Sequence, residues 1–153
     1  YGKLFENNAF QSPAKKVKQR MYELSEFLVQ VLGITNLGAS FPAKITYHDS
    51  CAGLRECKIK EEPRKLLNAV EGIEIVEMAD VETCCGFGGS FAVKYDTIST
   101  SMADQKIDHA IATNAEYIVS TDTSCLMHLE GRINHHGQAI KVLHLADILS
   151  AGY

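Results

Sequence analysis

The chain has 153 residues, of which 46% are hydrophobic and 22% are charged, and its formal net charge is −4. This size and composition are typical of one globular domain with a full core. The negative balance gives no indication of binding to nucleic acid or to an anionic membrane. No apolar run approaches the ~18–20 residues of a spanning helix, and the start shows no signal-peptide pattern.

The N-terminal part predicts a loop followed by one long helix. Residues 1–12 are loop-like, and residues 13–33 have the pattern of an amphipathic helix. Ser12 can cap this helix, Pro13 suits its first position, and Gly33 suits its end. Its apolar residues recur at the spacing of one helix face: Val17, Met21, Leu24, Leu28 and Val31.

Residues 43–153 alternate between strand and helix patterns. Strands are expected at Lys44–His48, Ile73–Met78, Tyr117–Thr121 and Ile140–Leu143, and helices at Glu61–Val70, Asp96–Asn114, Ser124–His136 and Leu145–Ser150. Such alternation is typical of right-handed βαβ units. The sequence therefore predicts one α/β domain, a parallel sheet of about four strands flanked by helices in a Rossmann-like three-layer sandwich.

Four cysteines follow the ends of three predicted strands. Cys51 comes after the first strand, Cys84 and Cys85 after the second, and Cys125 after the third. The carboxyl ends of parallel strands share one edge of the sheet, where open α/β folds bind ligands. Thiolates at one edge suit zinc, copper(I) or an iron–sulfur cluster. The odd count of five cysteines fits reduced thiols in the cytoplasm better than a disulfide framework.

The fifth cysteine and the histidines give weaker signals. Cys57 could reach the same edge or be a spectator thiol. His128 lies one helical turn after Cys125, a plausible spacing for a metal ligand, and His48 could orient a ligand or carry a proton. The remaining histidines suit surface or capping positions: His109, His135, His136 and His144.

The glycines after Cys85 need a separate explanation. Gly86, Gly88 and Gly89 follow a strand, but the Lys-Ser/Thr pair of a phosphate-binding loop is missing. We interpret them as backbone that can approach a cluster and direct N–H groups at its sulfurs. Asp122 is expected to cap the helix after the third strand.

Three stretches together carry a family resemblance: Tyr47-His48-Asp49-Ser50-Cys51, Cys84-Cys85-Gly86-Phe87-Gly88-Gly89 and Asp122-Thr123-Ser124-Cys125-Leu126-Met127-His128. They resemble the cysteine-rich CCG domain family, which includes the B subunit of heterodisulfide reductase, the iron–sulfur subunit of glycolate oxidase and lactate-utilisation protein A. Proteins of this family usually carry two copies of the domain. The chain has one copy and starts at Tyr1, so we expect it to be the C-terminal half of a two-domain protein.

The resemblance implies a cofactor and a role. The cofactor would be a cubane or non-cubane [4Fe-4S] cluster, or zinc in some relatives, held by Cys51, Cys84, Cys85 and Cys125. His128 stands where the family has a fifth cysteine. The implied role is electron transfer in cytoplasmic oxidation of lactate, glycolate or a similar 2-hydroxy acid, beside other iron–sulfur subunits. Thiolate clusters are often lost to oxygen, so an aerobically prepared fragment can lack the cluster.

Two other functions stay open from the residues. A closed zinc site would make the chain a structural or interaction domain without redox chemistry. Alternatively, Cys51 or the Cys84-Cys85 pair could be redox-active thiols, with Arg55 and His48 as groups that lower a thiol pKa. Metal content and colour distinguish these possibilities from an iron–sulfur cluster.

Overall fold

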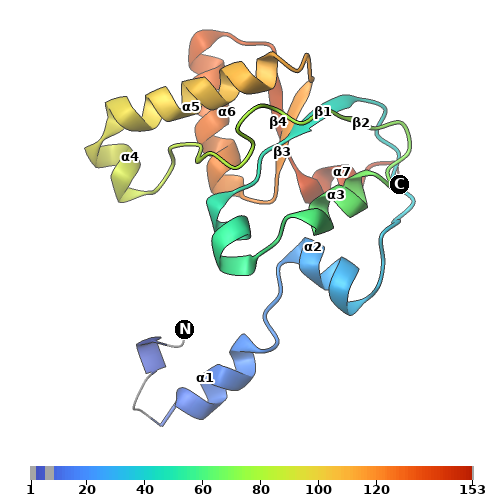
Figure 1. Cartoon of the computed structure of the whole chain (residues 1–153), viewed down its shortest axis with the longest axis vertical. Coiled ribbons are helices and arrows are strands. Elements are labelled where there is room, and N and C mark those ends of the chain that lie inside the picture. The colour runs from blue at the N-terminus through green and yellow to red at the C-terminus, as the bar shows by residue number, and fades with distance from the viewer. Residues whose placement is uncertain (1–2, 6–8, 153) are drawn as a thin grey trace.

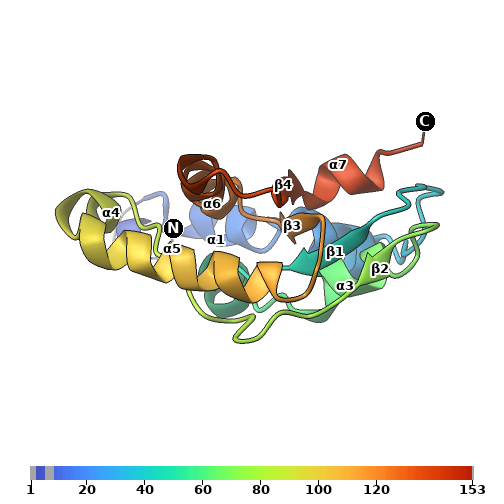
Figure 2. The ribbon, with the colours of Figure 1, turned by 90° about the horizontal axis from the view of Figure 1, so that it is seen from above.

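The computed structural model describes residues 3–5 and 9–152, and its centre is a parallel sheet. The strands are β1 (Lys44–Tyr47), β2 (Glu74–Ile75), β3 (Tyr117–Ser120) and β4 (Lys141–His144). All neighbouring pairs are parallel, and the order is β2-β1-β3-β4, with β2 and β4 at opposite edges (Figure 2). The predicted four-stranded parallel sheet is therefore confirmed.

Helices connect these strands and precede them. The α-helices are α1 (Gln11–Lys18), α2 (Leu24–Glu26), α3 (Glu61–Leu67), α4 (Ser90–Lys94), α5 (Asp96–Ile111), α6 (Thr123–His136) and α7 (Leu145–Leu149). The shorter helical segments are the 3-10 helix η1 (Lys3–Phe5) and the π-helices η2 (Phe27–Val31) and η3 (Gly53–Cys57). None of the helices in the described residues has the length and apolar character needed to cross a membrane.

The sheet carries a hydrophobic core on each face. Alternate strand residues point to opposite faces, so Val119 packs in one core and its neighbour Ile118 in the other. The first core is completed by α3 and α7, and the second by α5 and α6. Figure 1 shows these two pairs of helices on opposite sides of the sheet. The three layers agree with the predicted sandwich.

The N-terminal helix differs from the expectation. Instead of one helix over residues 13–33, α1 ends at Lys18 and a new helical segment begins at Leu24. Glu23 causes this break, because its carboxylate accepts hydrogen bonds from the backbone N–H groups of Ser25 and Glu26 and so caps the second segment. Figure 1 shows α1 apart from the sheet. Gly33, at φ +67, follows the last turn of η2, at the predicted end of the helical region.

The expected loop over residues 1–12 differs too, although residues 1–2 and 6–8 lie outside the described residues. Within the described part, Lys3–Phe5 are a 3-10 helix and α1 already begins at Gln11, before the expected cap Ser12. Two further differences concern the chain around the cysteines. The second strand is much shorter than Ile73–Met78, and α4 was not predicted.

Candidate metal centre

The end of β1 fixes His48 inside the sheet. The backbone N–H of His48 donates to Val119 (2.8 Å), and the His48 carbonyl accepts from the Ser120 hydroxyl (2.9 Å). The His48 side chain is fully buried. Ser50 then accepts a hydrogen bond from the backbone N–H of Gly53 (3.1 Å), which turns the chain into the helical segment that contains Cys51. His48 and Cys51 therefore both follow the end of β1, and hydrogen bonds fix the backbone of this segment.

Cys84 and Cys85 lie in the connection between β2 and α4, which Gly86 attaches to α5. The Gly86 carbonyl accepts from the Ser99 hydroxyl of α5 (2.8 Å), and the Gly86 N–H donates to the Cys84 sulfur (3.4 Å). Gly86 has φ +89, and a Cβ at this position would lie 2.3 Å from the Ser99 carbonyl oxygen. Glycine is required here for both reasons, and it sets the path of the backbone between the cysteines and α4.

The fourth cysteine lies at the start of α6. Asp122 caps this helix, because its carboxylate accepts from the N–H groups of Ser124 (2.9 Å) and Cys125 (3.3 Å). The predicted capping role of Asp122 is confirmed. Cys125 therefore projects from the first turn of a helix that begins directly after β3, at the edge of the sheet that also holds the ends of β1 and β2.

Three side chains from three different strand ends meet in the interior. One ligand atom of each of His48, Cys85 and Cys125 lies within 4.8 Å of the other two. Their exposed fractions are 0%, 1% and 4%. Cys51 and Cys84 are half-buried, and their thiols hydrogen-bond to each other. Cys51 also interacts electrostatically with Cys125, and Cys84 with Cys85. The structure thus brings together the four cysteines of the predicted cluster and adds His48.

The thiols of this centre have unequal proton affinities. A hydrogen bond from the Cys125 thiol, assisted by His48, lowers the pKa of Cys85 from 9.0 to about 4 against the opposing effect of burial. The same hydrogen bond and burial raise the pKa of Cys125. Burial raises the pKa of Cys84. Cys85 is therefore the more acidic thiol of the buried pair, and a thiolate is the form that binds metals.

His48 supplies the observation that tests whether a metal fits. Both of its ring nitrogens are buried, and neither makes a hydrogen bond of normal geometry with a described residue, although the ring interacts with the Cys85 thiol. Buried polar atoms are nearly always satisfied in proteins, and an unmatched one calls for a partner such as a bound ion. An imidazole nitrogen next to thiolates is a donor set that zinc and iron–sulfur centres use. The residues present therefore fit a metal or a cluster.

Other predicted site residues lie outside this group. The Nε2 atom of His128 lies 3.2 Å from the Ser99 hydroxyl, and its ring packs on Phe87. Cys57 is exposed at the end of η3 and lines a separate pocket beside Tyr22. Gly88 and Gly89 lie directly before α4, and Gly89 is its N-cap residue. Since His128 already contacts Ser99, its role as a ligand stays a prediction.

The half-buried side of the centre faces a cleft. An open cleft of about 680 Å³ has Cys84 in its wall, together with Arg55, Met78, Asp80, Val81, Glu82, Thr83 and Met102. Cys85 and Cys125 are buried beneath the surface and do not line it. Cys84 is thus the thiol that connects the buried centre with the wall of this cleft.

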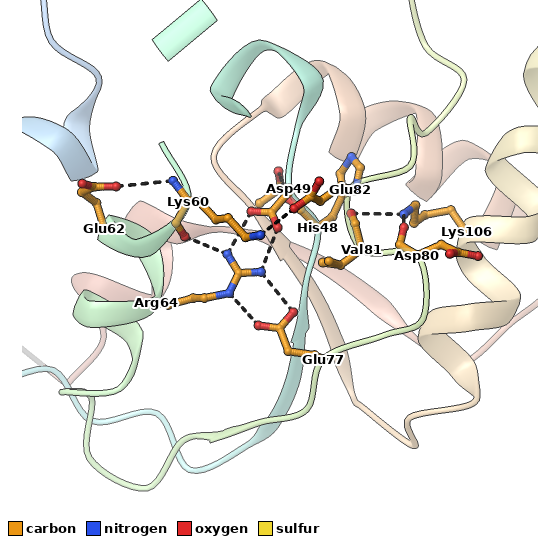
Figure 3. Close-up of polar contacts among 11 residues, drawn as sticks. His48, Asp49, Lys60, Glu62, Arg64, Glu77, Asp80, Val81, Glu82 and Lys106 are labelled. Atoms are coloured by element: carbon orange, nitrogen blue, oxygen red, sulfur yellow. Dashed lines mark hydrogen bonds and ion pairs between the residues drawn. The ribbon is translucent and has the colours of Figure 1, made fainter. Parts of the chain in front are cut away.

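A network of charged residues holds the loop around the centre (Figure 3). Arg64 of α3 donates two hydrogen bonds to the buried carboxylate of Asp49 (2.9 and 2.8 Å) and two to Glu77 (2.6 and 3.0 Å). The guanidinium also lies over the Tyr47 ring, 4.9 Å from its centroid. Lys60 adds an ion pair with Glu82 (2.6 Å). These contacts tie α3 to the segments that carry both His48 and the cysteines, and no sequence motif indicated them.

Comparison with known proteins identifies the family. Residues 45–130 match the family described as "Cysteine-rich domain", abbreviated CCG. The chain is 43% identical over 141 residues to lactate utilization protein A of Oceanobacillus iheyensis (92% of the chain, 58% of that protein) and 42% identical over 153 residues to lactate utilization protein A of Exiguobacterium sp. (99% and 62%). It is also 42% identical over 138 residues to uncharacterized protein YkgE of Escherichia coli K12 (90% and 58%). The chain spans about three fifths of the length of these relatives, and it belongs to the CCG cysteine-rich domain family.

Proposed function

We propose that the chain is the cluster-binding domain of an iron–sulfur electron-transfer subunit that acts in the oxidation of lactate, glycolate or a similar 2-hydroxy acid. The convergence of His48, Cys85 and Cys125 in a buried group carries this proposal. Cys51 and Cys84 border the group and complete a set of four thiols. The names of the two lactate utilization proteins support the substrate class.

Each residue of the centre has a definite contribution in this proposal. Cys51, Cys84, Cys85 and Cys125 hold the cluster, and His48 is the additional donor because its buried nitrogens make no hydrogen bond of normal geometry with a described residue. The cluster supplies a reversible one-electron change when it is bound. The Gly86 N–H, which donates to the Cys84 sulfur, stabilises negative charge on that ligand and so favours the reduced state.

The surroundings of the centre suit electron exchange with a partner. Burial of Cys85 and Cys125 keeps water from the inner side, while the half-buried Cys84 borders the open cleft. We propose that a second iron–sulfur subunit exchanges electrons through this side, and that a further CCG domain belongs to the same protein. Five free thiols suit work in the reducing cytoplasm.

Metal and sulfide analysis of protein purified without oxygen tests the proposal. We expect iron and sulfide in nearly equal amounts with a broad visible absorption band. Cys84→Ser and Cys85→Ser should abolish cluster retention, whereas Cys57→Ser, a matched change at an exposed thiol outside the centre, should retain it. Loss of the cluster in Cys57→Ser, or no iron in the unaltered chain, would contradict the assignment.

The two histidines give a second comparison. His48→Ala should loosen the cluster, because it removes the buried donor beside Cys85 and Cys125. His128→Ala removes a ring that lies against Ser99 and Phe87 and should have the smaller effect on metal content. The reverse order would restore His128 as the ligand that the sequence predicts.

A zinc-stabilised interaction domain is the second candidate. The closed group of one histidine and two cysteines favours it, because zinc commonly binds such buried nitrogen and sulfur donors. Stoichiometric zinc without sulfide, in a colourless protein, would establish this function. Electron transfer would then belong to another domain or subunit.

A further inference from the structure

One face of α5 holds the segment that carries the two adjacent cysteines, defined here as residues 79–86. Ser99 donates to the Gly86 carbonyl (2.8 Å), and His109 binds the Ala79 carbonyl through Nδ1 (3.0 Å). Between them, the Lys106 ammonium donates to the carbonyls of Asp80 and, at 3.2 Å, of Val81. Ser99 and Lys106 are two helical turns apart, so they lie on one face.

Lys106 is the unusual member of this group because it is only 1% exposed. Burying an ammonium group is costly, and the segment offers it two carbonyl oxygens, both neutral acceptors. Burial lowers the pKa of Lys106, while negative charge at Asp80, Cys85, Asp49 and Cys84 acts in the opposite direction. Figure 3 shows Lys106 reaching the segment from α5, on the opposite side from the Arg64 network.

We propose that Lys106 is a positioning residue for Cys84 and Cys85 and a buried cation that offsets the negative charge of the filled centre. Its hydrogen bonds fix the backbone three to five residues before the cysteines. Its charge lies close enough to both thiols for electrostatic interaction. This inference rests on the proposed metal-binding function: the positioning role holds for an iron–sulfur cluster or for zinc, whereas the charge role requires a filled centre with net negative charge.

Two substitutions separate position from charge. Lys106→Gln keeps a hydrogen-bond donor and removes the charge, and Lys106→Met removes both while it keeps the apolar stem. Lys94→Gln is the matched control, because it removes the same charge from an exposed lysine of α4. Zinc affinity is measured by competition with a chromophoric chelator, and the fold is followed by circular dichroism.

We expect Lys106→Met to lower zinc affinity about tenfold or more, the range seen when outer partners of a metal site are lost. Lys106→Gln should give a smaller loss, and Lys94→Gln none. In the iron–sulfur form, both Lys106 variants should lower the midpoint potential, because reduction adds negative charge to a site that has lost its buried cation. A purely structural role for Lys106 would leave the potential unchanged.

Unchanged zinc affinity in folded Lys106→Met would overturn the positioning role, and an unchanged potential in Lys106→Gln would overturn the charge role. If the Lys106 variants do not fold, His109→Ala tests the same anchoring at the half-buried end of the face. It should weaken zinc binding a few-fold, and no change would contradict the inference. A chain that binds zinc but never iron and sulfide would refute the proposed redox function and the charge role of Lys106, and would leave the zinc-affinity test of the positioning role intact.

Discussion

Replacing Gly86 by alanine should destabilise the chain strongly, because the backbone leaves no room for a methyl group at this position. Gly86 has φ +89, a conformation that costs an L-residue about 1–2 kcal/mol. The new Cβ would also lie 2.3 Å from the Ser99 carbonyl oxygen and 3.0 Å from the Met102 Cβ. Relieving such an overlap typically costs about 1–3 kcal/mol, so the total is about 2–5 kcal/mol.

Gly137→Ala provides the control for the backbone contribution alone. Gly137 ends α6 with φ 64 and ψ 32, and its added Cβ would meet nothing within 4 Å. This variant should lose only about 1–2 kcal/mol. The difference between the two variants therefore measures the overlap of residue 86 with α5.

Urea unfolding of the metal-free chain, followed by far-ultraviolet circular dichroism, gives both free energies of unfolding. The loop can relieve the overlap only by moving away from Ser99, so Gly86→Ala should also weaken zinc binding, whereas Gly137→Ala should not. Equal losses of stability in the two variants, or unchanged zinc affinity in Gly86→Ala, would refute the reasoning that α5 fixes this loop by direct backbone contact.

Two further predictions concern charge in and around the centre. Arg64→Met leaves the Asp49 carboxylate, which is 2% exposed, without its ion-pair partner, and should lower the free energy of unfolding in urea by about 3 kcal/mol. Arg132→Met, the control at a more exposed bidentate ion pair, should lower it by at most about 1 kcal/mol. Equal losses in the two variants would contradict the importance of burial. The pKa of Cys85 is about 4 in the folded chain instead of 9.0, so its ionisation stabilises the folded metal-free chain. This contribution to the free energy of unfolding is complete above pH 9 and is lost as the pH falls toward 4. Cys85→Ala should flatten that part of the stability profile, and parallel profiles of the two proteins would refute the shift.

The sheet and the meeting of the cysteines could be predicted because both depend on local patterns and one general rule. Short β-branched and apolar runs such as Tyr117–Ser120 indicate strands, and their alternation with helices makes the sheet parallel. Parallel strands share their carboxyl edge, so residues as distant as Cys51 and Cys125 lie near each other. No knowledge of side-chain packing was needed for either conclusion.

The N-terminal helix was predicted wrongly because periodicity ignores local competition for hydrogen bonds. The apolar spacing continues from Val17 to Leu28 without interruption, and it predicts one helix. Glu23 instead uses its carboxylate to start a second helix, and Leu28 packs against the core while Val17 stays exposed. The spacing identified apolar residues correctly but not the break between them.

The choice between His48 and His128 shows a similar limit. A spacing of three residues after Cys125 favoured His128, but the nearby Ser99 hydroxyl from α5 already contacts that ring. His48 ends a strand, and only the packing of neighbouring strands and loops shows that it is buried without a hydrogen bond of normal geometry to a described residue. Lys106 has even less sequence signal, because a lysine in an amphipathic helix is normally a surface residue.

The charges around the centre favour one of the two metal hypotheses. A zinc ion held by the thiolates of Cys85 and Cys125 with neutral His48 would have no net charge, so it would add nothing to the electrostatic compensation that Asp80 and Asp49 give a buried cation nearby. A cluster held by four thiolates has a net negative charge, which attracts a cation such as Lys106. The burial of Lys106 at 1% exposure beside the cysteine segment therefore supports the iron–sulfur proposal over zinc. The midpoint potential of Lys106→Gln tests this argument directly, because it measures the electrostatic coupling on which the argument depends.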